Sequence, residues 1–214
     1  MRAIIFDLDG VLADTNEIHG IVEAQLLAEH GIHTTVEEIT NSYAGIPTGT
    51  WFRQLIPDKS VDIEALMVRK RRMFREAVVN AKAMPGAKEL LQFTKQNRFR
   101  VAIGTGSKKD EAMATLKAIG IDKDFEVIIT ADDIVNGKPD PLIFLVAAKR
   151  LGVKPEECTV IEDGLAGMMA AKTAGMFCIG LVSKPSNMFP ADVQVSKLSD
   201  ITNDMLQGNK PKPF

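Results

Sequence analysis

The run Ala3-Ile4-Ile5-Phe6-Asp7-Leu8-Asp9-Gly10 decides the fold of this 214-residue chain. Its first four residues are apolar, as in a strand covered on both faces, and polar residues begin where that strand would end. Parallel sheets bind ligands in the crevice beyond the carboxyl ends of their strands, and Asp7 and Asp9 can both face such a crevice. Two carboxylates so close need a divalent cation between them or a proton on one of them, so the pair indicates an active site.

Four more apolar runs occur in the second half of the chain, and helical patterns separate them. Continuous apolar strands that alternate with helices are typical of β-α units around a parallel sheet. The runs that we predict to be strands, in addition to the first, are Val101–Ile103, Val127–Ile129, Thr159–Ile161 and Phe177–Leu181.

The segment from about residue 15 to residue 84 interrupts this alternation. It contains helical patterns and no convincing strand, which indicates an inserted domain. One helix is predicted from Ile18 towards Gly31, a second opens at the capping box Thr35–Glu38, and a third covers Ile63 to Val79.

The composition of the chain argues against several classes of binding partner. The formal net charge of -2 gives no general attraction for nucleic acid or for an anionic membrane. The four apolar residues before Asp7 are too few for a signal peptide, and no later stretch is long enough to span a membrane. Cys158 and Cys178 have neither metal-site nor disulfide spacing, so we expect reduced thiols. We therefore expect a cytoplasmic protein that binds neither nucleic acid nor a membrane, and we expect it to be a monomer.

Three later segments accompany the opening motif: Ile103–Ser107, Gly137–Pro141 and Val160–Gly164. Together the four resemble, in order and spacing, the motifs of the haloacid dehalogenase superfamily. The position of the insert resembles the helical cap of the subfamily that includes β-phosphoglucomutase and phosphoglycolate phosphatase. This resemblance implies an α/β fold, with a Rossmann-like parallel-sheet core of residues 1–14 and 85–214 and an inserted helical cap of residues 15–84.

The resemblance also implies roles for the first two motifs. Asp7 would be the nucleophile that forms an aspartyl-phosphate, and Asp9 would protonate the leaving group and later take a proton from water. The Thr105 hydroxyl and the backbone N–H groups of Gly106 and Ser107 would hold a phosphoryl oxygen. Ser107 also suits the N-cap of the next helix, and the sequence leaves both roles open for it.

The third and fourth motifs would supply charge and metal ligands. By the resemblance, Lys138 offsets the charge of the nucleophile and the phosphate, although a surface lysine at a turn is the alternative. Mg²⁺ would be held by Asp7, the main-chain carbonyl of Asp9 and Asp163, with Glu162 binding directly or through water. The alternative for the acidic pair is the capping of a helix.

The predicted cap offers weaker candidates for substrate binding. His19 would help to gate the cap, or would simply be packed on its helix. The residues placed against the organic part of the substrate are Gly45, Ile46, Pro47 and Thr48. The basic run from Arg69 to Arg75 could steer phosphates, but a solvated helix face is the favoured interpretation.

These motifs predict a Mg²⁺-dependent phosphatase for a small phosphate monoester, such as a sugar phosphate. A carbon–halogen bond would not need the proton of Asp9, so a dehalogenase is disfavoured. A phosphomutase is the first alternative, but the segment from Tyr43 to Thr48 has neither Lys nor Arg to hold a second phosphate. A receiver-type signalling domain is the second, and the inserted cap argues against it.

Overall fold

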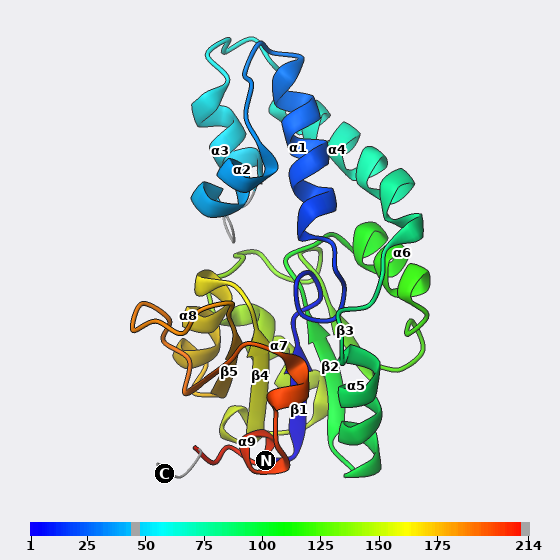
Figure 1. Ribbon diagram of the computed structural model, residues 1–214, viewed down its shortest axis with the longest axis vertical. Helices are drawn as coiled ribbons and strands as arrows, with labels where there is room; N and C mark the ends of the chain where they lie inside the picture. Colours follow the sequence, from blue (N-terminus) through cyan, green and yellow to red (C-terminus); the bar gives the residue numbers. More distant parts are fainter. Residues whose placement is uncertain (44–47, 211–214) are drawn as a thin grey trace.

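A computed structural model describes residues 1–43 and 48–210. A six-stranded parallel sheet in the order β3-β2-β1-β4-β5-β6 forms the centre of the larger part of the molecule (Figure 1). The Rossmann-like α/β architecture predicted from the sequence is confirmed. The strands are β1 (Ala3–Phe6), β2 (Arg100–Gly104), β3 (Val127–Ile129), β4 (Cys158–Glu162), β5 (Phe177–Leu181) and β6 (Val193–Val195).

The two central strands set the position of the motifs. All four residues of β1 are buried, and Phe6 is in register with Ile103 of β2 and Ile161 of β4. The motif residues that follow these three strands therefore emerge at one edge of the sheet. The five predicted strands are all present, whereas β6 was missed because it is a three-residue edge strand with a polar residue at its centre.

Helices cover both faces of the sheet, as continuous apolar strands require. One face packs against α5 and α6 through residues such as Leu91 and Leu116. The other packs against α7 and α8 through residues such as Phe144 and Met168. The helices of this part are α5 (Ala87–Gln96), α6 (Lys109–Ile119), α7 (Leu142–Leu151), α8 (Leu165–Thr173) and α9 (Asn203–Leu206), with 3₁₀ turns at Pro155–Glu157 and Leu198–Asp200. A further 3₁₀ turn, Val78–Asn80, belongs to the inserted segment.

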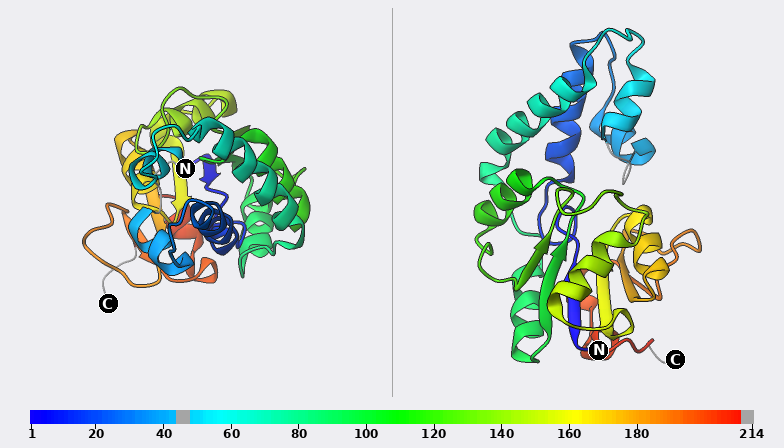
Figure 2. Two further views of the ribbon diagram at one scale, coloured as in Figure 1. Left: turned by 90° about the horizontal axis from the view of Figure 1, so that it is seen from above. Right: turned by 180° about the vertical axis from the view of Figure 1, so that it is seen from behind.

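The segment after the first motif is helical and forms a separate layer above the sheet edge (Figures 1 and 2). Its helices pack on their own apolar cluster, which includes Leu26, Trp51 and Phe52. The predicted capping box is present, because Glu38 accepts from Thr35 N–H and Glu38 N–H donates to the Thr35 hydroxyl. The helices are α1 (Asn16–Ala28), α2 (Val36–Tyr43), α3 (Thr48–Leu55) and α4 (Ile63–Ala77).

Helix α3 was not predicted. Thr48, which we grouped with the three residues before it as a substrate-binding candidate, is the first residue of this helix. The short length of α3 explains the difference, because eight residues are too few to form a stable helix alone. Its stability comes from burying Trp51 and Phe52 against the other cap helices. Gly45, Ile46 and Pro47 lie outside the described residues.

Two passages of chain join the helical layer to the sheet. Ala13 pairs with Ala83 in an antiparallel bridge, Asp14 N–H donates to the Lys82 carbonyl and Met84 N–H donates to the Leu12 carbonyl. This pairing coincides with the predicted junctions at residues 14/15 and 84/85, although the division into two domains stays a prediction. In the described part of the chain, no helix is long and apolar enough to cross a membrane.

Candidate active site

The side chains of three motifs meet where their strands end. Asp7 follows β1, and its N–H donates to the Ile161 carbonyl of β4 at 2.9 Å. Lys138 arrives from the loop between β3 and α7, and its Nζ lies 2.6 Å from Asp7 Oδ1 and 2.7 Å from Glu162 Oε2. All three side chains are nearly buried. Lys138 is therefore an internal counter-ion, and the surface-lysine alternative is wrong.

These ion pairs control the charge of Lys138. Burial alone would lower the pKa of its ammonium group, but the carboxylates of Asp7 and Glu162 outweigh burial and hold the pKa above its usual value. The lysine thus stays positively charged at neutral pH. A permanent cation beside Asp7 suits a site that must hold a phosphate.

The acidic residues outnumber this one lysine. Ligand oxygens of Asp7, Glu162 and Asp163 all lie within 4.8 Å of one another. Burial and the nearby Glu162 charge raise the pKa of Asp7 well above its usual value and raise that of Asp163 to about 7. Hard carboxylate oxygens with uncompensated charge are the donor set that Mg²⁺ prefers, so the residues present fit a divalent cation.

The orientation of Glu162 bears on whether it would coordinate a cation directly or through water. Its Oε2 accepts from Lys138, and its Oε1 accepts from Gly164 N–H at 3.0 Å. Both oxygens are therefore already occupied by donors. This geometry favours an indirect role for Glu162, through water or through Lys138, over direct coordination.

Two glycines make room for the acidic side chains. A Cβ atom at Gly10 would lie 2.0 Å from Asp163 Oδ2, and a Cβ at Gly167 would lie 2.1 Å from Glu162 Oε2. Gly167 belongs to α8 and has ordinary helical backbone angles. A glycine is therefore needed here because Glu162 occupies the space of a side chain, and not because of the backbone conformation. Asn16 of α1 also reaches this corner and donates to Asp163 Oδ2 at 3.1 Å.

Asp9 is surrounded by hydrogen-bond donors. Its Oδ1 accepts from the Thr15 hydroxyl at 2.6 Å and lies 3.3 Å from His19 Nε2; its Oδ2 accepts from the Ser107 hydroxyl at 2.7 Å and from Thr105 at 3.4 Å. Burial would raise the pKa of Asp9. The hydrogen bonds from His19, Thr15 and Ser107 outweigh it and hold that pKa far below its usual value, so Asp9 is a carboxylate here.

The second motif lies beside Asp9. The Ser107 hydroxyl donates to Asp9 and does not cap α6, which begins at Lys109; Glu111 instead accepts from Lys108 N–H. The N-cap alternative for Ser107 is therefore wrong. Ser107 N–H donates to Thr105 Oγ1, and Gly106 is exposed at the surface of the crevice edge.

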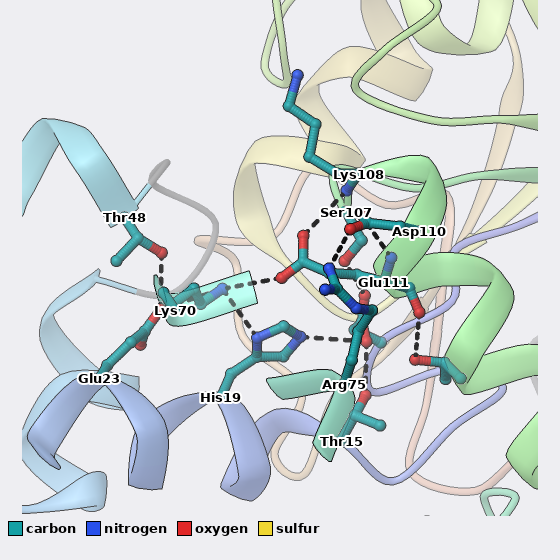
Figure 3. A network of polar contacts seen from close by, with 12 residues as sticks. Thr15, His19, Glu23, Thr48, Lys70, Arg75, Ser107, Lys108, Asp110 and Glu111 are labelled. Atoms are coloured by element: carbon teal, nitrogen blue, oxygen red, sulfur yellow. Dashed lines mark hydrogen bonds and ion pairs between the residues drawn. The ribbon is translucent and has the colours of Figure 1, made fainter. Parts of the chain in front are cut away.

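A cap residue that we did not predict from the sequence supports this arrangement. Lys70 of α4 was assigned to a solvated basic face, but its side chain is only 11% exposed and its Nζ lies 3.1 Å from His19 Nδ1 (Figure 3). His19 also stacks on Phe74, with ring centroids 4.0 Å apart. Lys70 lies four residues after Leu66 and four residues before Phe74, and both of these are buried. This helical spacing places Lys70 on the buried face of α4 and could have predicted its burial.

The neighbours of Lys70 in the basic run are paired at the surface. Arg69 forms a bidentate pair with Glu29, and Arg75 pairs with Asp110 of α6. The predicted solvated face is thus correct for these two arginines. Thr48 lies farther from the motifs and donates its hydroxyl to Glu23 Oε1 at 2.7 Å.

Comparison with known proteins identifies the family. A family model described as haloacid dehalogenase-like hydrolase matches residues 1–175, which is most of the chain. The chain belongs to this family. It is therefore an enzyme of the hydrolase class, and the resemblance predicted from the four motifs is confirmed.

Relatives within the haloacid dehalogenase-like hydrolases include phosphatases and mutases. The chain is 34% identical over 189 residues to a phosphorylated carbohydrates phosphatase of Thermotoga maritima, with 82% of each chain covered. It is 32% identical over 216 residues to the β-phosphoglucomutase of Bacillus subtilis, with 96% of this chain and 94% of that protein covered. A crystal structure of β-phosphoglucomutase from Clostridium difficile matches with a TM-score of 0.86 at 29% identity, covering 97% and 96%. The phosphatase interpretation of the motifs agrees with this family.

Proposed function

We propose that this protein is a Mg²⁺-dependent phosphatase that hydrolyses a small hydroxylated phosphate monoester through an aspartyl-phosphate. The observation that carries the proposal is the contact of Asp7 with Lys138 at the same sheet edge as Asp9. Asp7 lies beside a fixed ammonium group, whereas Asp9 accepts hydrogen bonds from hydroxyl groups and lies beside an imidazole. Such a pair divides the work between a nucleophile and a proton carrier.

The nucleophilic step begins with Asp7. Its ionised carboxylate attacks phosphorus, the bond from phosphorus to the ester oxygen breaks, and Asp9 gives a proton to that oxygen. A water molecule then attacks the aspartyl-phosphate, and Asp9 takes its proton. Free phosphate and Asp7 are regenerated, so atoms and charges balance.

The cap takes part in the proton transfer. Asp9 is a carboxylate in this structure because four donors surround it, and two of them, Thr15 and His19, come from the segment that we assign to the cap. A cap movement that removes these donors raises the proton affinity of Asp9 and allows it to act as an acid. Residues 15–84 would thus form a cap whose movement relative to the sheet controls the protonation of Asp9.

Lys138 and Mg²⁺ would together offset the negative charge of the carboxylates and of the phosphate. Asp7, Asp163 and the Asp9 carbonyl would hold the cation, with Glu162 acting indirectly. When bound, the cation offsets the negative charge on the phosphoryl oxygens. Lys138 neutralises Asp7 enough for two anions to approach, and Thr105, Gly106 and Ser107 contribute donors on the other side of the phosphate.

A phosphomutase is the second candidate, because a β-phosphoglucomutase is among the relatives. A mutase must hold two phosphates in turn. Thr48 is a neutral residue whose hydroxyl is bonded to the carboxylate of Glu23, which would repel a second phosphate. The cap therefore favours hydrolysis.

The experiment that tests this proposal is a survey of phosphorylated metabolites with the purified protein and Mg²⁺. We expect continuous release of inorganic phosphate, with the Asp7→Asn protein as the inactive control. Conversion of β-glucose 1-phosphate to glucose 6-phosphate without phosphate release would instead support the mutase. The absence of both phosphate release from every ester, including p-nitrophenyl phosphate, and this conversion would overturn both candidates.

A further inference from the structure

Three charged side chains meet between the cap and the sheet domain and have no part in the chemistry above. They are Glu23 of α1, Lys70 of α4 and Glu111 of α6, and their side chains are 9%, 11% and 5% exposed. Lys70 Nζ lies 3.7 Å from Glu23 Oε1 and 3.8 Å from Glu111 Oε1. Figure 3 shows the lysine between the two carboxylates. We call these three residues the junction cluster.

The junction cluster has more acceptors than donors. Lys70 has one partner within hydrogen-bond distance among the described residues, His19 Nδ1, and both carboxylates lie beyond that distance. Glu111 Oε2 accepts from Lys108 N–H, whereas Glu111 Oε1 is buried and has no hydrogen-bond partner in the part of the chain that the structure describes. A buried acceptor without a partner is destabilising, so this atom points to a donor that the free protein does not supply.

The cluster lies next to the proton carrier. Glu23 follows His19 by one helical turn, so both side chains project from one face of α1. His19 Nε2 contacts Asp9, and its Nδ1 contacts Lys70 of the cluster. His19 therefore links the junction cluster directly to Asp9, the residue that in the proposed function protonates the ester oxygen.

Thr48 fixes one member of the cluster. Its hydroxyl donates to Glu23 Oε1, and because Thr48 begins α3, this bond ties two cap helices together. Glu23 keeps its second oxygen, Oε2, free of any hydrogen bond to the described residues. The cluster therefore presents fixed acceptors with a net negative charge, since two carboxylates face one ammonium group.

We infer that the junction cluster is a subsite for the leaving group, in which Glu23 and Glu111 accept hydrogen bonds from its hydroxyl groups. This inference rests on the proposed phosphatase function and defines its substrate class. The preferred substrate is the monophosphate of a polyhydroxylated compound. Esters without hydroxyl groups leave the acceptors unpaired, and a second phosphoryl group meets a net negative charge.

The test uses two esters of equal chain length, a hexitol 6-phosphate and n-hexyl phosphate. The wild-type protein should prefer the hexitol ester in kcat/KM. Glu23→Met removes the acceptor with little change in volume and should lower that preference by roughly 10- to 100-fold. Glu23→Gln keeps an acceptor but removes the charge, so it should retain part of the preference and serves as the conservative variant.

A bisphosphate supplies a second readout that depends on charge. Glu23→Gln should raise kcat/KM for hexitol 1,6-bisphosphate relative to the monophosphate, because one repulsive charge is gone. Glu64→Gln is the matched control, since Glu64 lies on α4 with an 86% exposed side chain. It should change neither ratio.

The outcomes separate the subsite from the phosphatase activity. If the wild-type protein hydrolyses both esters and each Glu23 variant leaves both ratios unchanged, the cluster is a structural tie between cap and sheet domain and the subsite is wrong. The subsite is also wrong if the wild-type protein prefers n-hexyl phosphate. If it hydrolyses neither ester nor p-nitrophenyl phosphate, the proposed phosphatase function itself has failed.

Discussion

Lys138 Nζ lies 2.6 Å from Asp7 Oδ1, although 131 residues separate the two in the chain. The same ammonium group also holds Glu162 at 2.7 Å. One cation thus faces the carboxylates of Asp7, Glu162 and Asp163, and burial together with the surplus of negative charge raises the pKa of Asp7 and of Asp163. That surplus makes the site sensitive to substitution, to pH and to metal.

Asp7→Asn should abolish phosphate release and leave the fold intact. The amide has nearly the same shape but is a poor nucleophile, and it removes one charge from a crowded acidic site. The melting temperature of the metal-free variant should therefore equal or exceed that of the wild-type protein. Phosphate release and circular dichroism measure the two effects. A folded variant with normal turnover would exclude Asp7 as the nucleophile.

Asp9→Asn should slow alkyl phosphates by about 10²–10⁴-fold, because general acid catalysis is lost. The hydrolysis of p-nitrophenyl phosphate should be slowed less, since its leaving group departs without a proton. The comparison of kcat for the two substrates measures the proton transfer alone. Equal losses on both would show that Asp9 acts in another way, for instance by shaping the site.

Mg²⁺ binding should depend on pH through Asp163. The pKa of this residue is about 7 in the metal-free fold, above its ordinary value of 3.8, so the folded state holds a proton that the unfolded state has lost. The metal-free protein therefore loses stability as pH rises from about 4 to 7. A bound cation would replace that proton and so prevent this loss of stability at high pH.

The measurement for this prediction is thermal unfolding with EDTA or with saturating Mg²⁺. The gain in melting temperature from Mg²⁺ should be larger at pH 8 than at pH 5. Titration calorimetry should show affinity that increases up to about pH 7 and then levels off. A gain that is the same at both pH values would remove Asp163 from the metal site.

Gly167→Ala should destabilise the protein although alanine is the better helix former. The added Cβ would overlap Glu162, whose carboxylate is held by Lys138, and overpacking of this kind costs about 1–3 kcal/mol. Gly49→Ala in α3 is the matched control, because its Cβ would make ordinary contacts of 3.5 Å or more. Chemical denaturation should show a loss for the first variant and none for the second. The same stability change in both would mean that Glu162 is free to move.

The motif residues could be predicted because strand ends fix their positions. Asp7 and Asp163 follow apolar runs that were predicted to belong to one parallel sheet, so both were expected at the same sheet edge without knowledge of the loops. Their closeness also depends on the pairing of β1 with β4, which the structure supplies. Lys138 comes from a loop, and its position was available only through the resemblance to a family. The closeness of Asp7 and Lys138 is a tertiary result that no local pattern contains.

The cap was harder to predict because its contacts are between helices. Lys70 stands in a run of basic residues whose neighbours are exposed, and charge alone assigned it to solvent. Its burial follows from the packing of α4 on α1 and α6, which brings His19 and Glu111 within reach. Helix α3 was missed for a related reason, since so short a helix is stable only when its apolar face packs against the other cap helices.

Thr48→Arg should change the ranking of substrates. In the present chain the Thr48 hydroxyl holds Glu23, and the position carries no positive charge. A guanidinium group there would pair with Glu23 and offer donors to a second phosphate, so hexitol 1,6-bisphosphate should gain about tenfold in kcat/KM relative to the monophosphate. Thr50→Arg, at an exposed position of the same helix, is the control and should leave the ranking as it is.

The ratio of kcat/KM values, and not the absolute rate, is the quantity that decides this prediction. An arginine near a crevice attracts every phosphate by long-range electrostatics, and Thr50→Arg carries the same added charge. A change in ratio that occurs with Thr48→Arg and is absent with Thr50→Arg therefore reports contact at the start of α3. If both arginines raise kcat/KM for all esters by one common factor, the start of α3 does not select the substrate, and discrimination must come from other residues of the cap.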